Sequence, residues 1–286
     1  MEVGWGGRDG LSRRKASWIT SLPEIRAVNN DDRVPLLIRK MKMCEAKYDF
    51  SSPRIDAAQK EGKRKTLVEI VEYMSSDRSS NLFADSRIYA PLCSMVAANL
   101  FRALTICEGD EEDLYDPEDG EPLMEPDWSH VSLVYEVLRR FVTASELNTK
   151  LARKVIDQRF VLGLFDLFQS EDPRERECLK TIVHRIYGRF VPMRSFIRRT
   201  IQHVFHHYIY SDDAHSSGVA ELLEILGSVI NGFSVPLKPD HREFLLRTLI
   251  PLHSAAALTK YYPQLSFCVS QFLEKEPQLA ESVLLG

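Results

Sequence analysis

The sequence predicts an all-α fold of the α-solenoid class, and three observations favour it. Apolar residues recur at helical spacing in one segment after another, and short polar breaks separate these segments. No window alternates apolar and polar residues as a half-buried strand does. About a dozen such helices cannot share one bundle core, so we expect a HEAT/armadillo-like solenoid of about six degenerate helix pairs.

The predicted solenoid occupies residues 31–286 and follows a polar, Gly-rich segment, residues 1–30, which we expect to be disordered. Asp32 is expected to cap the first helix. Apolar periodicity then predicts helices over 54–76, 86–104, from Trp128 onward, 148–158, 160–169, 173–190, 192–211, 217–233, 240–253 and 258–274. Pro277 fits the first turn of a last, short and apolar helix. Because solenoids usually end in a repeat with a polar outer face, this ending predicts truncation at the C-terminus.

Charge is unevenly distributed along the chain. The formal net charge is −4, from 41 acidic and 37 basic residues. Eleven of the acidic residues lie in residues 108–127, a stretch without Lys or Arg that is expected to form an acidic loop. The rest of the chain is therefore net positive, and the total charge excludes neither acidic nor basic partners.

The sequence is typical of a soluble intracellular protein. It contains no run of about 18 apolar residues that would span a membrane, and no apolar signal-peptide core. Its cysteines are scattered without a CxxC pair, which predicts buried thiols in a reducing compartment and no zinc site. They are Cys44, Cys93, Cys107, Cys178 and Cys268. We expect a cytoplasmic location, with the nucleus as a second candidate compartment.

The basic span, residues 178–210, is the stretch that carries most information about function. It has six Lys or Arg residues and no Asp or Glu. Helical phasing places Lys180, His184 and Tyr187 on one face, with Arg185 at its edge. Such a run is usually a solvated helix face. Here the absence of compensating acidic residues favours a surface that binds an acidic partner.

Other chemistries have less support in the sequence. His203 and His207 are four residues apart on one helix, but no third metal ligand is evident. A basic helical surface could instead bind RNA, although Glu221, Glu224 and the acidic loop oppose that interpretation. No phosphate-binding glycine loop, nucleophile elbow or HExxH motif is present. We therefore expect no catalytic residues, no metal and no cofactor.

Several longer runs carry a family resemblance. They are residues 171–176, 179–181, 184–188, 220–228, 230–233, 251–253 and 271–275. In these runs the chain resembles the B-prime (B56-type) regulatory subunit family of protein phosphatase 2A. The similarity extends from about Leu22 to near the C-terminus and is densest over residues 155–275.

The resemblance implies a HEAT-like fold and a non-catalytic subunit that recruits substrates or adaptors to a phosphatase. Its implied partners are a catalytic subunit, a scaffold subunit and short acidic peptides of the form Leu-x-x-Ile-x-Glu, with no membrane. The implied peptide-binding residues are Lys180, Thr181, His184, Arg185, Tyr187, Arg194, Ile225, Val229, Lys238 and His241. Ile225 and Val229 would form a slot for the apolar side chains, and Lys238 with His241 would receive the Glu. Val229 departs from the family, whose members usually carry Ile there. The alternative is an RNA-binding or general peptide scaffold without a phosphatase.

Overall fold

The structure is a computed structural model of the chain, and it describes residues 22–50, 52, 54–76, 81–104, 122–210, 217–255 and 257–285. Every regular element in these ranges is helical, which confirms the predicted all-α class. Contacts divide the chain into two compact units, residues 1–102 with 124–156 and residues 103–123 with 157–286. Residues 105–121, which hold most of the predicted acidic loop, lie outside the described residues, as do residues 1–21 and Cys107.

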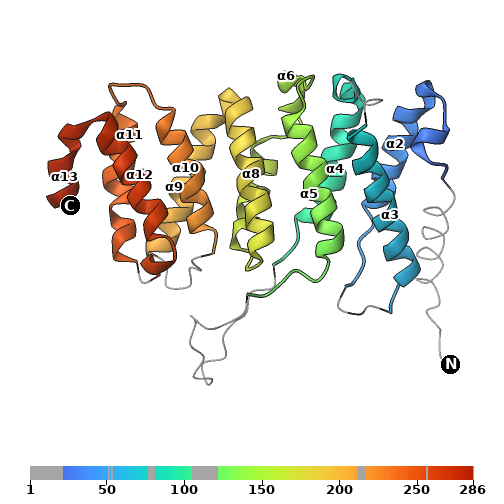
Figure 1. Cartoon of the computed structure of the whole chain (residues 1–286), viewed down its shortest axis with the longest axis horizontal. Coiled ribbons are helices and arrows are strands. Elements are labelled where there is room, and N and C mark those ends of the chain that lie inside the picture. Colours follow the sequence, from blue (N-terminus) through green and yellow to red (C-terminus); the bar gives the residue numbers. More distant parts are fainter. Residues whose placement is uncertain are drawn as a thin grey trace, which may run out of the picture. The chain divides into compact units, whose positions relative to one another are not determined.

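The first unit contains four long helices in two layers (Figure 1). Helix α2 packs on α4 in one layer and α3 packs on α5 in the other, and the contacts α2–α3 and α4–α5 join the layers. This is the layering of a HEAT-like stack. The elements are η1 (Ile25–Ala27), α2 (Asn30–Cys44), α3 (Ala57–Met74), η3 (Leu82–Ala84), η4 (Ser86–Ile88), α4 (Tyr89–Leu100), α5 (Trp128–Thr143) and α6 (Thr149–Ala152).

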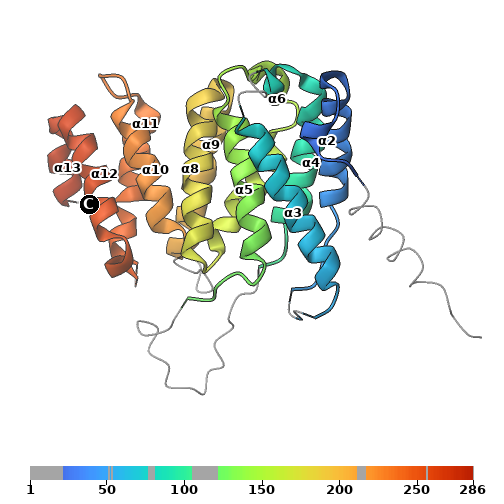
Figure 2. The ribbon, with the colours of Figure 1, turned by 45° about the vertical axis from the view of Figure 1, so that its right-hand side comes forward.

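The second unit repeats the two-layer pattern (Figure 2). One layer contains α7, α9 and η7, and the other contains α8, α10 and α12, which pack side by side in that order. The helices are α7 (Gln158–Asp166), α8 (Pro173–Arg189), α9 (Arg194–Tyr210), α10 (Val219–Asn231), α11 (Pro239–Phe244), α12 (Tyr262–Lys275) and α13 (Ala280–Leu285). The short elements are η5 (Leu167–Gln169), η6 (Val191–Met193), the π-helical η7 (Leu245–Leu249), η8 (Pro251–Ser254), η9 (Leu258–Lys260) and η10 (Pro277–Leu279).

Three details of the predicted elements were wrong. Helix α2 begins at Asn30 rather than at a cap on Asp32, and Ile25 is already fully buried before it. Ordered structure therefore precedes the predicted start at residue 31. The helix predicted over 148–158 is only the single turn α6, because Asn148 and Asp157 each accept hydrogen bonds from the main-chain N–H groups that follow them. Two N-terminal caps so close together leave room for one turn between them.

Gly218 sets the start of α10. Its φ is +81°, and a Cβ there would lie 2.5 Å from the Phe168 carbonyl oxygen. Only glycine adopts this conformation at such close approach without strain.

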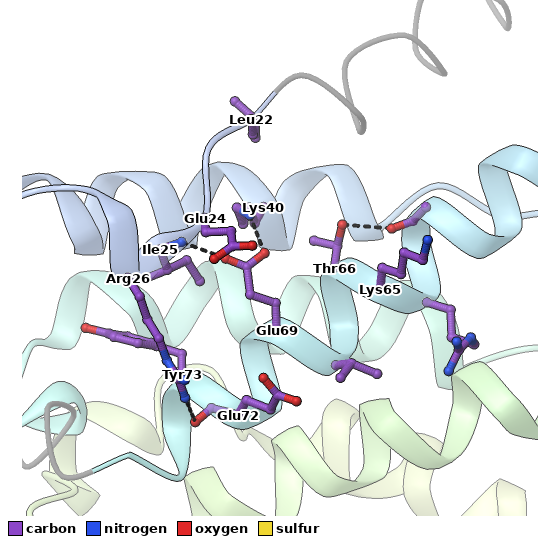
Figure 3. Close-up of a pocket in the computed structure, with 13 residues that line it drawn as sticks. Leu22, Glu24, Ile25, Arg26, Lys40, Lys65, Thr66, Glu69, Glu72 and Tyr73 are labelled. Atoms are coloured by element: carbon purple, nitrogen blue, oxygen red, sulfur yellow. Dashed lines mark hydrogen bonds and ion pairs between the residues drawn. The ribbon is translucent and has the colours of Figure 1, made fainter.

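A largely buried ion pair holds the N-terminal turn against α2 and α3 (Figure 3). Lys40 on α2 is 4% exposed and pairs with Glu69 on α3. The other Glu69 oxygen accepts a hydrogen bond from the Ile25 amide at 2.6 Å. A pocket of about 490 Å³ lies beside this pair, and its lining side chains include both charges. The pair neutralises the buried ammonium, so Glu69 holds η1, α2 and α3 together.

Glu69→Ala is expected to lower the free energy of unfolding by about 2–4 kcal/mol, because it leaves the buried Lys40 ammonium and the Ile25 amide without their partner. Glu72→Ala is the matched control, since Glu72 is exposed on the same helix and, within the described ranges, only its main-chain carbonyl is hydrogen-bonded, by Arg26 and by the Ser75 amide. Urea unfolding of both variants and the wild type measures the difference. Equal midpoints for the two variants would show that the buried pair contributes no net stability.

Candidate functional site

Helix α8 presents the basic span from a well-defined start. Asp172 caps it through a hydrogen bond from the Arg174 amide at 2.9 Å, and Pro173 occupies its first turn. Its apolar residues face the core and are buried: Leu179, Ile182, Val183 and Ile186. This orientation leaves Lys180, His184 and Tyr187 partly exposed on the other side, as the helical phasing predicts.

Three side-chain contacts join α8 to α10. Arg176 Nε donates to Glu221 Oε1 at 2.8 Å, Lys180 Nζ to Glu224 Oε2 at 2.6 Å, and His184 Nε2 lies 2.9 Å from Ser228 Oγ. The partners are 45, 44 and 44 residues apart in sequence. We call this set the α8–α10 ladder.

The ladder corrects the prediction that the positive charges of the basic span lack compensation. Lys180 pairs with Glu224 and also with Glu177, one turn earlier, at 2.6 Å. Both acidic residues lie outside the span, so a count within residues 178–210 misses them. Partial burial lowers the pKa of Lys180, but the hydrogen bonds and charges of Glu177 and Glu224 outweigh it and leave the pKa raised. Lys180 is therefore a paired cation rather than a free one.

Tyr187 is held in place by two arginines from the segment that follows. Arg194 Nε donates to the Tyr187 carbonyl at 3.0 Å, and the Arg194 guanidinium lies 5.4 Å from the centre of the Tyr187 ring. Arg198 Nη1 donates to the Tyr187 hydroxyl at 3.0 Å. The structure thus brings Tyr187 and Arg194 together, and Arg194 acts by positioning the ring.

A small cavity of about 100 Å³ lies where α9, α10 and α11 meet. We call it the carboxylate pocket after the ligand that is proposed for it below. Its lining residues are Ser195, Arg198, Arg199, Gln202, Leu226, Phe233, Asp240, His241 and Phe244. Two guanidinium groups and a hydroxyl bring hydrogen-bond donors to the pocket, Asp240 adds a carboxylate, and the Gln202 amide already donates to Thr248 Oγ1 at 3.2 Å.

His241 is the most distinctive member of the carboxylate pocket. It is 8% exposed and stacks on Phe233 with ring centroids 3.7 Å apart. Its Nδ1 atom is buried and has no hydrogen-bond partner among the described residues. Burial, followed by the positive charges of Arg198 and Lys238, lowers the pKa of His241, against the smaller opposing effect of Asp240.

Four of the other predicted residues are at least partly exposed: Arg185, Lys238, Thr181 and His184. Arg185 is exposed and has no ion-pair partner in the described part of the chain, and Lys238 is exposed at the start of α11. Thr181 is partly exposed. Burial and the neighbouring Arg185 charge lower the pKa of His184.

Ile225 and Val229 do not form an open slot in this state. They are 1% and 5% exposed, because α10 packs between α8 and α12 and turns these apolar residues into the core. Their helical spacing showed that they share a face, but it could not show that the face is covered.

Sequence reasoning missed Arg198 and Phe233 as members of the site. Arg198 was counted among the charges of the basic span without a role, although it contacts Tyr187 and lines the pocket beside His241. Phe233, two residues after the end of α10, stacks on His241. Only the close approach of α9, α10 and α11 reveals these roles.

The metal interpretation of the histidines gains no support. His206 Nε2 lies 3.1 Å from Thr248 Oγ1 and 3.2 Å from the Arg247 carbonyl oxygen, so it joins α9 to η7. Among the described residues, no group of three His, Cys, Asp or Glu side chains could hold a metal ion. None of the helices in the described ranges is both long and apolar enough to cross a membrane.

Known proteins resemble the chain over most of its length. The family described as "Protein phosphatase 2A regulatory B subunit (B56 family)" matches residues 22–286. The 56 kDa regulatory subunit delta isoform of serine/threonine-protein phosphatase 2A from Saccharomyces cerevisiae is 46% identical over 94% of this chain and 35% of its own length. The delta isoform from Homo sapiens is 46% identical over 94% of this chain and 44% of its own. The 56 kDa regulatory subunit alpha isoform from Mus musculus is 44% identical over 93% of this chain and 53% of its own.

The chain thus spans between about a third and about half of the length of these relatives. The family match, however, covers nearly all of the chain itself, and its start at residue 22 coincides with the first described residue. This chain belongs to the B56 family of protein phosphatase 2A regulatory B subunits.

Proposed function

We propose that the chain is a non-catalytic regulatory subunit of protein phosphatase 2A that recruits substrates by binding acidic peptides. Family membership supports the regulatory role. The observation that carries the binding role is the carboxylate pocket, whose walls combine the guanidinium groups of Arg198 and Arg199 with the His241 ring. A peptide carboxylate there would pair with these cations and accept hydrogen bonds from their guanidinium groups.

The proposed ligand is a Leu-x-x-Ile-x-Glu peptide. Its Glu would enter the carboxylate pocket, with Lys238 at the rim. Arg185, exposed and without an ion-pair partner in the described ranges, would meet an acidic or phosphorylated flank. His184, which contacts Ser228 on α10, and Tyr187, which contacts Arg198 on α9, would touch the peptide backbone.

The apolar residues of the peptide would bind over Ile225 and Val229. Because both side chains are buried here, that step requires the neighbouring side chains to move apart. Such side-chain movement is common at binding interfaces, where side chains change rotamer even if the backbone does not move.

Recruitment would act through effective concentration. A substrate held by a short motif stays close to the active site of a separate catalytic subunit, which raises its local concentration without new contacts at that active site. The catalytic subunit and a scaffold subunit are the proposed partners, and the cytoplasm and nucleus are the proposed compartments. The metal-dependent chemistry would belong to the catalytic partner.

A fluorescent Leu-x-x-Ile-x-Glu peptide is expected to bind with micromolar affinity, about −8 kcal/mol. Arg198→Ala is expected to weaken binding by about 2–5 kcal/mol, because it removes a donor facing a carboxylate that remains desolvated. Arg185→Glu would weaken the binding of a peptide with an acidic flank, since it replaces attraction by repulsion. Lys238→Ala tests the rim of the pocket.

Lys260→Ala is the control for these titrations, because Lys260 is exposed on η9 and lines neither the carboxylate pocket nor the α8–α10 ladder. Fluorescence anisotropy against each purified variant gives the dissociation constants. If Arg198→Ala, Arg185→Glu and Lys238→Ala all bind as the wild type does, the basic surface is only a solvated helix face.

The affinity is also expected to increase as the pH falls from 8 to 6. In the free protein the pKa of His241 is lowered by burial and by the charges of Arg198 and Lys238, so the ring is neutral at pH 8. A carboxylate in the pocket favours the charged ring and raises that pKa, so the complex binds protons that the free protein does not. The gain in affinity is about two- to tenfold over this range, as one pKa unit corresponds to a factor of ten.

Isothermal titration calorimetry in buffers of different ionisation enthalpy measures the proton uptake. His241→Gln is expected to abolish it, and proton release by the wild type would contradict the proposal.

Co-purification tests the regulatory role itself. The tagged chain is expected to capture phosphatase catalytic and scaffold subunits from a cell lysate, and the purified chain alone is expected to release no phosphate from phosphopeptides. Robust metal-dependent phosphate release by the pure chain would contradict the assignment. Capture of ribonucleoprotein in place of phosphatase subunits would favour an RNA-binding scaffold, the second candidate that the basic span suggests.

A further inference from the structure

A second pocket lies between α7 and α9, the two α-helices in the layer of the second unit that also contains η7. Its volume is about 470 Å³ and its lining residues are Gln158, Leu162, Phe196, Arg199, Thr200 and His203. We call it the α7–α9 pocket. The size is within the range of sites that accept a large side chain with its flanking backbone.

The floor of the α7–α9 pocket is apolar. Leu162 is 42% exposed, although α7 turns its other large apolar side chains into the core. Phe196 is partly exposed on α9, and the Thr200 hydroxyl is already used in a hydrogen bond to the Phe196 carbonyl at 3.1 Å. An exposed leucine beside a partly exposed aromatic ring gives an apolar ligand a place to bury surface.

The rim of the same pocket is basic and uncompensated. Arg199 and His203 are one helical turn apart on α9 and both are exposed. Neither has an ion-pair or hydrogen-bond partner in the described ranges, in contrast to Lys180 and Arg176 on α8. No acidic side chain lines the pocket, and the nearby Asp157 carboxylate accepts a hydrogen bond from the Phe160 amide at 2.9 Å as the α7 cap.

We propose that the α7–α9 pocket is a second peptide-docking site, which takes one large apolar side chain flanked by acidic residues. The apolar floor would bury the side chain, and Arg199 with His203 would pair with the flanking carboxylates. The site is distinct from the carboxylate pocket, because Leu162 and His203 line only the α7–α9 pocket, whereas Arg199 lines both. A protein partner fits better than a nucleic acid, since a phosphate backbone is held by many cations in a row and this rim offers two.

The test uses two fluorescein-labelled peptides, Asp-Glu-Asp-Leu-Asp-Glu-Asp and its analogue with Ala in place of Leu. The leucine peptide is expected to bind the full chain at least about tenfold more tightly than the alanine analogue, because it buries more apolar surface. Leu162→Asp and His203→Glu are expected to weaken binding of the leucine peptide by about tenfold or more, as each puts negative charge beside the acidic flank. Lys260→Glu, an exposed charge reversal away from both pockets, is expected to leave it unchanged.

The same variants distinguish binding at the α7–α9 pocket from binding of the Leu-x-x-Ile-x-Glu peptide at the carboxylate pocket. Leu162→Asp is expected to bind the Leu-x-x-Ile-x-Glu peptide as the wild type does, whereas Arg198→Ala is expected to lose that peptide and keep the acidic leucine peptide. Circular dichroism melts confirm that each variant is folded. Three results would overturn the α7–α9 site: equal affinity for the leucine and alanine peptides, full binding by Leu162→Asp, or displacement of the leucine peptide by a twelve-nucleotide oligouridylate.

Discussion

The α8–α10 ladder is the constraint on which the candidate site depends. Arg176, Lys180 and His184 recur at four-residue intervals on α8, and each meets its partner on α10. All three contacts form together only in the observed alignment, and a shift of α10 by one turn would keep fewer pairs, so the ladder favours this register of the two helices. Through that register it also fixes where α10 ends, and therefore where Phe233 stacks on His241.

The ladder also shows the repeat that the sequence hides. Its partners are 44 or 45 residues apart, and other contacts between neighbouring helices have similar separations: Cys268 Sγ donates to the Leu223 carbonyl 45 residues away, and His206 meets Thr248 at 42. These values fall within the range of about 40–47 residues for HEAT and armadillo repeats. The side chains that make these contacts differ in kind: Lys180 forms an ion pair between α8 and α10, whereas the Cys268 thiol joins α12 to α10. Sequence comparison of the repeats therefore finds little, while the spacing of the backbone is kept.

Most helices could be predicted from the sequence, and the failures have identifiable causes. Apolar periodicity located α3, α8, α9, α10 and α12 to within a few residues, since each buries one face. It failed for residues 148–158, because Asn148 and Asp157 each cap a separate helix. A search for apolar periodicity does not detect such single-residue caps. Within the site, residues that share one helix were placed correctly, as for Lys180, His184 and Tyr187. Contacts between helices could not be predicted, which is why the pairing of Lys180, the burial of Ile225 and the role of Arg198 appeared only in the structure.

The structure also changes what the basic span means. Its charges are of two kinds: Lys180, Arg194 and Arg198 already hold neighbouring groups, whereas Arg185 and Arg199 have no ion-pair partner within the described ranges. The first kind fixes the shape of the surface, and the second kind leaves positive charge on it that no acidic side chain of the described ranges neutralises. Arg198 and Arg199 are adjacent in sequence, but the helical twist of about 100° per residue directs them differently. Arg198 lies against Tyr187 and the carboxylate pocket, while Arg199 reaches the α7–α9 pocket as well. One helix can therefore line two separate pockets, because its buried residues, Ile197, Thr200, Ile201 and Phe205, leave Arg198 and Arg199 outside the core.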